Sequence, residues 1–511
     1  MLIVGGINLK KNYIFKIIIL IFFIMINPYK EVHGKDITSD VGYIFSTQRY
    51  ITSQQNKTII NFKDKNLETG IREKLNKPKG DITKDEVNNI EELTINHKDI
   101  FSLDGIQYLT NLKKLNLAFN KIIDISPLNS LTNIESLNLG YNQINGISPL
   151  SNLISLKELN MQSNKISNIS PIKGLINLKI LSFYSNNLTN LQPLSGLINL
   201  DDLNLYINKI EDIQPLKSLV NLTRLALGMN KISNIDVIKG LTRLEVLQLD
   251  QNKITEIKPL SNLTELTQLH LSGNRVKNIN SLKTLTSLIY LELSNNEITN
   301  ISGLGKLTNL KNLNLDKNKI NNLKGLGTAR NLESIRIEYN EVCSLDELSS
   351  LTKLYTLDLG NNKIINIKPL SFLYKLKSLN ISNNRIRDIR LLRNLPELAL
   401  TNIDFSNNPL PKYVFRDKLN EEFILSILAP YIDGAIKQYY GEHRLYVDAE
   451  VLSIENSEGK YKLKIRVVTF VGPHNPPYGI ETMVITQDYS KIKVEEFKHE
   501  EEKPIKVESI D

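Results

Sequence analysis

The sequence predicts an α/β protein in which a long solenoid with a parallel β-sheet is followed by a small α+β domain. Three observations predict it. Asparagines recur every 22 residues from Asn120 to Asn384, and a longer last step reaches Asn408. Apolar residues keep the same interval eight, five and three residues before each asparagine and two residues after it. A fixed short period indicates stacked supersecondary units, each covering the apolar edge of its neighbour. After Asn408 the period ends, and the pattern becomes one helix and four strands.

Within each repeat, leucines alternate with polar residues, as at 115–117, and this alternation predicts a short strand. Strands of successive coils stack ~4.8 Å apart into a parallel sheet on the concave side of the solenoid. We expect each column asparagine to point inward and to both donate and accept hydrogen bonds, because the chain turns there and leaves backbone groups unpaired. Prolines seven residues later, such as Pro127, predict an irregular convex side, since proline would break a helix.

The motif L-x-x-L-x-L-x-x-N, written LKKLNLAFN at 112–120, resembles the leucine-rich repeat of bacterial internalins. The whole coil at 112–133, LKKLNLAFNKIIDISPLNSLTN, is similar to the short 22-residue subclass of that repeat. The resemblance implies a horseshoe-shaped leucine-rich repeat solenoid over residues 93–410. It also implies an internalin-like protein that binds another macromolecule through its concave face.

A helical cap is expected before the repeats, over residues 59–92. Leu67, Ile71 and Leu75 have helical spacing, and Asp64 fits the N-cap of that helix. Thr83-x-x-Glu86 is a capping box that starts a second short helix. The stretch INFKDKNLETGIREKLNKPKGDITKDEV resembles the helical cap that precedes internalin repeats. Such a cap covers the first core layer of a solenoid.

The first 34 residues predict an export signal. Three lysines precede the apolar run 17–26, and residues 32–34 offer a cleavage site before Lys35. The run is too short to cross ~30 Å of hydrocarbon comfortably. Residues 35–58 are polar and predict a flexible leader. Because no cysteine follows the run, and the end at Asp511 has neither a wall-sorting motif nor a hydrophobic tail, we expect a secreted or cell-surface protein without a covalent anchor.

Composition argues against several kinds of site. Cys343 is the only cysteine, which excludes an internal disulfide and a cysteine-rich metal site and predicts an ordinary free thiol. His270 has no second histidine or cysteine at ligand spacing. The net charge of +8 is modest for 511 residues. With no catalytic constellation in the repeats, we predict a non-enzymatic protein without metal or cofactor.

Large apolar residues at outward positions of the concave strands are the candidate binding residues. These positions lie six, four, two and one residues before each column asparagine. They carry Phe119, Tyr141, Tyr184, Tyr206, Ile207, Met229, Tyr290 and Tyr339. Exposed aromatic residues on a rigid sheet serve as anchors for a protein partner, although aromatic residues also suit strands for structural reasons alone. We interpret them as a protein-binding face on a monomeric protein.

Charges differ between the concave face and one edge of the solenoid. Acidic concave residues, among them Asp250, Asp316 and Asp358, outnumber the basic ones, and this argues against a nucleic-acid partner. The position directly after the column asparagine forms a basic ridge. The ridge comprises Lys121, Lys165, Lys209, Lys231, Lys253 and Arg275. It is either a solvated consensus position or a contact for an anionic cell-wall polymer. The second reading gives an alternative function, a cell-wall-associated protein held by this ridge and by the C-terminal domain.

Residues 411–511 predict a separate α+β domain. A helix at 421–440, kinked at Pro430, precedes strands at 445–453, 462–471, 481–487 and 491–497, which we expect to form an antiparallel sheet. The segments AIKQYYGE and TFVGPHNPPYGIETMVI resemble a small secreted domain of unknown function from Gram-positive bacteria. His474 with Glu481 or His499 fits a metal or acid–base site. The paired prolines and Gly479 favour a rigid structural loop instead.

Overall fold

The computed structural model describes residues 58–398, 402–410, 418–441, 445–457, 460–470, 479–488 and 491–501. The predicted export signal, the predicted leader up to residue 57 and the His474 loop lie outside these residues. Across the described ranges, no helix combines the length and the apolar character needed to cross a membrane.

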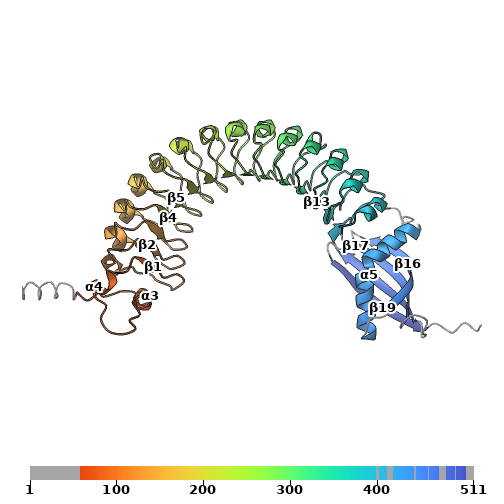
Figure 1. Cartoon of the computed structure of the whole chain (residues 1–511), viewed down its shortest axis with the longest axis horizontal. Helices are drawn as coiled ribbons and strands as arrows, with labels where there is room; N and C mark the ends of the chain where they lie inside the picture. The colour runs from red at the N-terminus through yellow and green to blue at the C-terminus, as the bar shows by residue number, and fades with distance from the viewer. Residues whose placement is uncertain are drawn as a thin grey trace, which may run out of the picture. The chain divides into compact units, whose positions relative to one another are not determined.

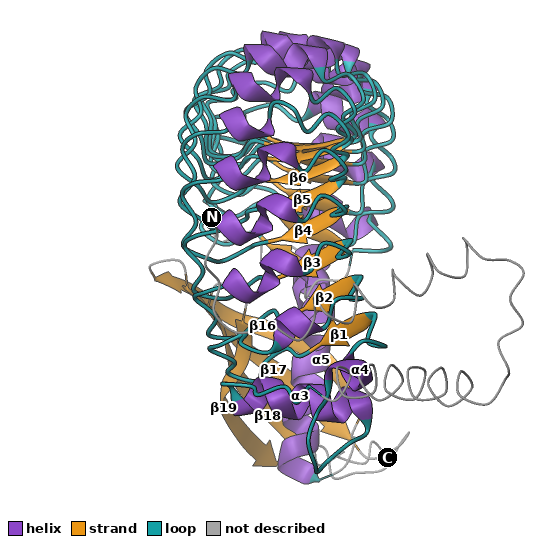
Figure 2. Cartoon of the chain, turned by 90° about the vertical axis from the view of Figure 1, so that its left-hand side faces the viewer, coloured by secondary structure: helices purple, strands orange, loops and turns teal. Residues whose placement is uncertain are grey.

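The repeat region forms a parallel sheet of fifteen strands that pair in chain order. Neighbouring strands are in register, so that Leu93 lies beside Leu115 and Leu115 beside Leu137. In Figure 1 these strands line the inner side of the array, and Figure 2 shows β1 to β6 stacked one above another. The strands are β1 (Glu92–Thr94), β2 (Lys114–Asn116), β3 (Ser136–Asn138), β4 (Glu158–Asn160), β5 (Ile180–Ser182), β6 (Asp202–Asn204), β7 (Arg224–Ala226), β8 (Val246–Gln248), β9 (Gln268–His270), β10 (Tyr290–Glu292), β11 (Asn312–Asn314), β12 (Ser334–Arg336), β13 (Thr356–Asp358), β14 (Ser378–Asn380) and β15 (Ile403–Asp404).

The convex side consists of short 3-10 helices, so the expectation of an irregular convex chain was wrong. Pro127 and its counterparts lie in the first turn of these helices, where proline's fixed φ is suitable and its missing N–H is not needed. An Asp or Asn precedes most of them; the Asp124 carboxylate, for example, accepts the Ser126 N–H at 2.9 Å. The helices are η1 (Ile106–Tyr108), η2 (Ser126–Ser130), η3 (Ser148–Asn152), η4 (Ser170–Gly174), η5 (Gln192–Leu194), η6 (Gln214–Ser218), η7 (Asp236–Gly240), η8 (Lys258–Asn262), η9 (Asn280–Thr284), η10 (Ser302–Lys306), η11 (Leu326–Thr328), η12 (Asp346–Ser350), η13 (Lys368–Phe372) and η14 (Arg390–Asn394).

The column asparagines form the predicted ladder between coils. The Asn252 side chain donates to the carbonyl oxygens of Leu227 in the preceding coil and Leu249 in its own, both at 3.0 Å. Its Oδ1 accepts the Ile232 N–H at 2.9 Å. The same bonds recur from Asn120 to Asn408. Each amide therefore donates and accepts, which confirms the prediction.

Both helices predicted before the repeats are present. Helix α3 (Lys65–Leu75) has Asp64 as its N-cap, which accepts the N–H groups of Asn66 and Leu67. The second oxygen of Asp64 accepts the Phe101 N–H at 2.7 Å, which ties the helix start to the array. Helix α4 (Lys84–Val87) begins with the capping box, in which the Glu86 carboxylate accepts the Thr83 N–H at 2.8 Å.

The C-terminal part is one helix on a four-stranded antiparallel sheet, as predicted. Helix α5 (Lys418–Tyr440) precedes β16 (Leu445–Ser457), β17 (Lys460–Phe470), β18 (Gly479–Asp488) and β19 (Lys491–Glu501), which pair in chain order. Four isoleucines and leucines of α5, spaced for one face, are buried against β17 and β18. These helix residues are Ile424, Leu428, Ile432 and Ile436. The helix starts three residues earlier than expected, and all four strands are longer than expected.

Candidate protein-binding face

The residue directly before each column asparagine adopts a left-handed backbone. Its φ lies between +51° and +57° at Phe119, Tyr141, Ile207, Met229 and Tyr339. Side chains with a Cβ are strained in this region, and a β-branched residue such as Ile207 most of all. Glycine and asparagine tolerate it best. The array itself uses these two at Gly273, Asn295, Asn361, Asn383 and Asn407. Bulky residues in this column, which we call the left-handed column, are therefore not there for backbone stability.

Four of the large residues in the left-handed column project into solvent. Phe119, Tyr141, Met229 and Tyr339 are 39% to 51% exposed. Phe119 and Tyr141 stack with ring centroids 4.1 Å apart, and His97 stacks on Phe119 at 4.3 Å. His97 was missed by sequence reasoning because it lies in the degenerate first coil, although it stands 22 residues before Phe119. These three stacked rings form a continuous aromatic surface, the aromatic stack.

Tyr184 and Tyr206 lie along the sheet and are half-buried. Their rings stack at 5.9 Å. The Tyr206 hydroxyl donates to the Asp250 carboxylate two coils away. Burial, together with this bond, raises the pKa of the Tyr206 hydroxyl. The ring crosses Gly228, where a Cβ would lie 2.2 Å from a ring carbon. Gly228 therefore makes room for Tyr206 to reach Asp250.

A shallow groove of about 430 Å³ runs over β1 to β5. Its lining combines strand leucines and the exposed Ile180 with charged and polar outward residues, including the Lys114–Glu92 ion pair at 2.7 Å. The groove and the aromatic stack belong to the same N-terminal coils. The N-terminal half of the concave face thus carries both the aromatic stack and the groove.

The other half of the concave face is acidic. Asp316 is buried and bonds both to the Arg336 guanidinium at 2.9 Å and to the Glu338 N–H at 2.7 Å. Burial raises the pKa of Asp358 to about 6, and the nearby Glu338 and Asp316 carboxylates also raise it, while the Gly360 N–H and Arg336 act in the opposite direction. The Glu338 and Asp316 carboxylates beside Asp358 make this half of the face locally acidic.

His270 and Tyr290 lie between these two halves. Their rings stack at 4.9 Å, and burial lowers the pKa of His270. Glu292 accepts hydrogen bonds from the Ser294 N–H and the Asn314 amide, each at 2.9 Å. Within the described residues, no group of three or more histidine, cysteine, aspartate or glutamate side chains is placed to hold a metal ion.

A family model described as leucine-rich repeats matches residues 110–153, 132–174, 176–218, 220–262, 242–284 and 286–327. The crystal structure of the internalin InlF from Listeria monocytogenes is 35% identical, with a TM-score of 0.61, and the match covers 62% of this chain and 95% of that one. The chain belongs to the internalin-type leucine-rich repeat family. Leucine-rich repeat proteins of this kind generally mediate protein–protein binding.

Two further structures resemble the internalin-type array. A leucine-rich repeat protein from Leptospira interrogans is 29% identical, covering 62% of this chain and 84% of that one, with a TM-score of 0.59. The functional domain of InlJ from Listeria monocytogenes, 24% identical over 67% of this chain and 80% of that one, shares the fold with a TM-score of 0.57. Residues 420–501 match a family described as a protein of unknown function (DUF3888). Among curated proteins, no sequence matches the chain significantly. Neither family match indicates a catalytic activity.

The basic ridge of the internalin-type array is partly neutralised. Lys121 pairs with Asp99 at 3.0 Å, and Lys231 pairs with Glu211 at 3.4 Å. The other predicted members make no ion pair within the described part of the chain. These unpaired members are Lys165, Lys209, Lys253 and Arg275. Cys343, three residues after Asn340, is an exposed free thiol, as expected.

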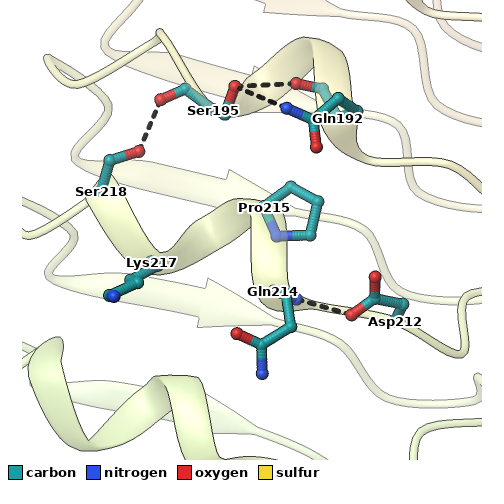
Figure 3. A pocket seen from close by; sticks show the side chains of 7 residues that line it. All are labelled: Gln192, Ser195, Asp212, Gln214, Pro215, Lys217 and Ser218. Atoms are coloured by element: carbon teal, nitrogen blue, oxygen red, sulfur yellow. Dashed lines mark hydrogen bonds between the residues drawn. The ribbon is translucent and has the colours of Figure 1, made fainter.

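A convex hollow of about 450 Å³ lies where η5 is shorter than its neighbours (Figure 3). Its side chains bond to the protein itself: Ser195 bonds to Gln192, Ser218 donates to the Ser195 carbonyl oxygen at 2.5 Å, and Asp212 accepts the Gln214 N–H at 2.8 Å. Several of the polar groups that line this hollow therefore bond within the protein itself.

In the C-terminal part, the structure brings Glu481 and His499 together on neighbouring strands. Glu481 is fully buried, and its carboxylate lies 3.0 Å from His499 Nδ1. The Tyr440 and Thr469 hydroxyls also bond to Glu481. A Cβ on Gly479 would lie 2.4 Å from the carboxylate, so glycine permits this convergence. The cluster joins α5 to three strands, while His474, the third residue of the site considered from the sequence, lies outside the described residues.

Proposed function

We propose that the protein binds a protein partner through its concave face, with the left-handed column as the anchor. The observation that carries the proposal is that Phe119, Tyr141, Ile207, Met229 and Tyr339 occupy backbone positions suited to glycine or asparagine. Such residues lower the stability of the fold, and most of them are also exposed. Binding energy from buried aromatic anchors explains their presence.

The two halves of the face suggest the chemistry of the partner. The aromatic stack and the groove over β1 to β5 suit an apolar segment with a protruding side chain. The acidic half, with the half-buried Asp358, suits a segment that carries lysine or arginine. We therefore expect a protein partner with an apolar contact followed by a basic one. The partner would meet the protein outside the producing cell, since residues 1–34 are predicted to direct export.

The decisive experiment replaces anchors by the residue that the backbone prefers. Phe119→Asn with Tyr141→Asn should leave the urea midpoint unchanged or raise it, because asparagine suits left-handed φ. Affinity for a partner captured by the wild-type protein should fall more than about tenfold, because hot-spot side chains commonly contribute ~2 kcal/mol or more each.

Ser163→Asn is the matched control. Ser163 belongs to the same column, with φ of +51°, but has no large side chain to lose. This variant should share the gain in stability and keep full affinity. Unchanged affinity in the double variant would remove the concave anchor from consideration.

A second candidate role is retention at an anionic wall polymer. It is favoured by the exposed cations Lys209, Lys253 and Arg275, which have no ion-pair partner among the residues described. Because an unpaired surface cation keeps its full charge for a ligand, these side chains are the ones that would contact such a polymer.

A further inference from the structure

Four consecutive coils carry an exposed apolar residue on one lateral edge, away from the concave face. The residues stand ten positions before their column asparagines and form what we call the lateral stripe: Ile154, Ile176, Ile198 and Val220. They are 48% to 60% exposed. Most other coils have threonine at this position. These are Thr110, Thr132, Thr242, Thr264, Thr286, Thr308 and Thr352. The coil fold therefore does not require an apolar residue here.

The backbone beneath the lateral stripe is held rigidly. The Asn177 amide donates to the Ile154 carbonyl oxygen at 3.0 Å, and the Asn199 amide donates to that of Ile176 at 2.9 Å. The third bond of the series, from Asn221 to Ile198, is also 2.9 Å long. The apolar side chains thus form a row with one member in each of four successive coils.

The surface beside the stripe is open. Gly174 and Gly196 stand two residues before Ile176 and Ile198, and a Cβ at either glycine would meet nothing within 4 Å. Internal packing therefore does not demand these glycines. Their lack of a side chain leaves space in which a second surface can approach the stripe closely.

The charges beside the stripe are complementary to those of a second copy of the stripe that runs in the opposite direction. Lys179 and Asp201 stand three residues after Ile176 and Ile198, and Lys179 makes no ion pair within the described ranges. If two stripes lie antiparallel about a twofold axis, Ile176 of one copy faces Ile198 of the other. Lys179 of each copy then faces Asp201 of the other.

On the opposite flank the same operation brings no like charges together. Lys173 falls opposite Ser195, and Lys217 falls opposite Ser151. A surface that is complementary to itself when reversed suits a second copy of the same chain better than a lipid surface, which would need a broad apolar area without alternating charge.

We propose that the lateral stripe is the interface of an antiparallel homodimer of this chain. The concave strands use other columns of the repeat, so the dimer can present two binding faces. This replaces the monomer expected from the sequence. Specific interfaces bury ~800 Å² per partner, whereas four such side chains supply a few hundred. The dimer should therefore be weak, with a dissociation constant on the order of micromolar.

Sedimentation velocity of the protein across about 1 to 100 µM tests the proposal, because this range spans the expected dissociation constant. The wild type should change from monomer to dimer. Ile176→Thr with Ile198→Thr should raise the dissociation constant at least about tenfold, and threonine at this position in other coils ensures that the coil still folds. Ile365→Thr is the matched control, because Ile365 is equally exposed, at 59%, in a different column; it should leave dimerisation unchanged.

A charge swap tests the antiparallel geometry. Lys179→Asp should weaken the dimer, because it places aspartates opposite each other, and Asp201→Lys should weaken it through opposed lysines. The double swap should restore it. A protein that stays monomeric throughout this range overturns the proposal, and so does a double swap that fails to rescue association while the circular dichroism melt is unchanged.

Discussion

At the scale of single residues, the column asparagine is the side chain that joins one coil to the next. Asn252 satisfies carbonyl groups of two coils and a backbone N–H of the preceding one. Water cannot replace these bonds easily, because the residue is buried. The side chain is therefore fully committed to structure.

Asn252→Ala should lower the free energy of unfolding by roughly 1–3 kcal/mol, because buried backbone groups lose their partner. Asn145→Ala is the control, since Asn145 is exposed and lies outside the ladder; its urea melt should match that of the wild type. Equal stability of the two variants would contradict the ladder as a source of stability.

Asp358 predicts a pH-dependent difference in stability. Its pKa rises from 3.8 to about 6 on folding, so the folded state favours the protonated form. The wild type should therefore match Asp358→Asn below pH 4 and become the less stable of the two as the pH rises from 4 to 6. Thermal melts of both proteins across this range measure the difference.

Asp388 serves as a control, because its pKa is shifted in the opposite direction to that of Asp358. The hydrogen bond to Arg390 lowers the pKa of Asp388, so the ionised form is favoured in the fold. Asp388→Asn should therefore be destabilising near neutral pH, and this loss should fade as the pH falls below 3.8. If the difference in thermal stability between the wild type and Asp358→Asn did not change with pH, the raised pKa of Asp358 would be refuted.

At the scale of elements, η10 and η11 approach each other unusually closely. A Cβ on Gly305 would lie 2.0 Å from the Gly325 carbonyl oxygen, and backbone cannot move aside as a flexible side chain can. Gly325 itself has φ of +87°, which glycine adopts without strain. Glycines thus set the spacing of these two coils.

Gly305→Ala should destabilise the array by roughly 1–3 kcal/mol through overpacking. Gly303→Ala, in the same short helix, is the matched control, since its Cβ would meet nothing closer than 3.5 Å. That substitution should be neutral or slightly stabilising, because alanine restricts the unfolded chain. Urea denaturation of both variants provides the measurement, and the idea fails if both behave alike.

At the scale of the whole molecule, the C-terminal part has a hydrophobic core of its own, centred on Ile432, Ile465 and Met483. Calorimetry of the protein should therefore show a transition that disappears when residues 411–511 are removed. The repeat transition should persist, together with concave-face binding. Loss of that binding on truncation would transfer the function to the C-terminal part.

Retention on cells gives a prediction for the basic ridge. If its unpaired lysines hold the protein to an anionic polymer, moderate salt should release it, because exposed charges are screened within ~8–10 Å. Lys209→Glu with Lys253→Glu should weaken retention at low salt, whereas Lys231→Glu should have a smaller effect, because Lys231 already pairs with Glu211. Retention through a high-salt wash would exclude the ridge as the contact.

The sequence by itself determined the stacked coils, their order and their register. In a protein built from 22-residue repeats, each coil contacts only the coils next to it in the sequence. Periodicity alone therefore specifies the core, the strands and the asparagine ladder from Asn120 to Asn408. The helix caps at Asp64 and Thr83 were also predictable, because capping depends on residues within one turn. The outward position of Phe119 and Tyr141 followed from the same periodicity.

Only the tertiary structure decided what those outward positions mean. Left-handed φ in the residue before each asparagine arises where the chain turns after each strand, and residues such as Ile207 give no local signal of it. The contacts of Tyr206 with Asp250 and of His97 with Phe119 join different coils, so their geometry depends on how the coils stack. The 3-10 helices were missed for a related reason: the prolines that argue against a long helix also fit the first turn of a short one.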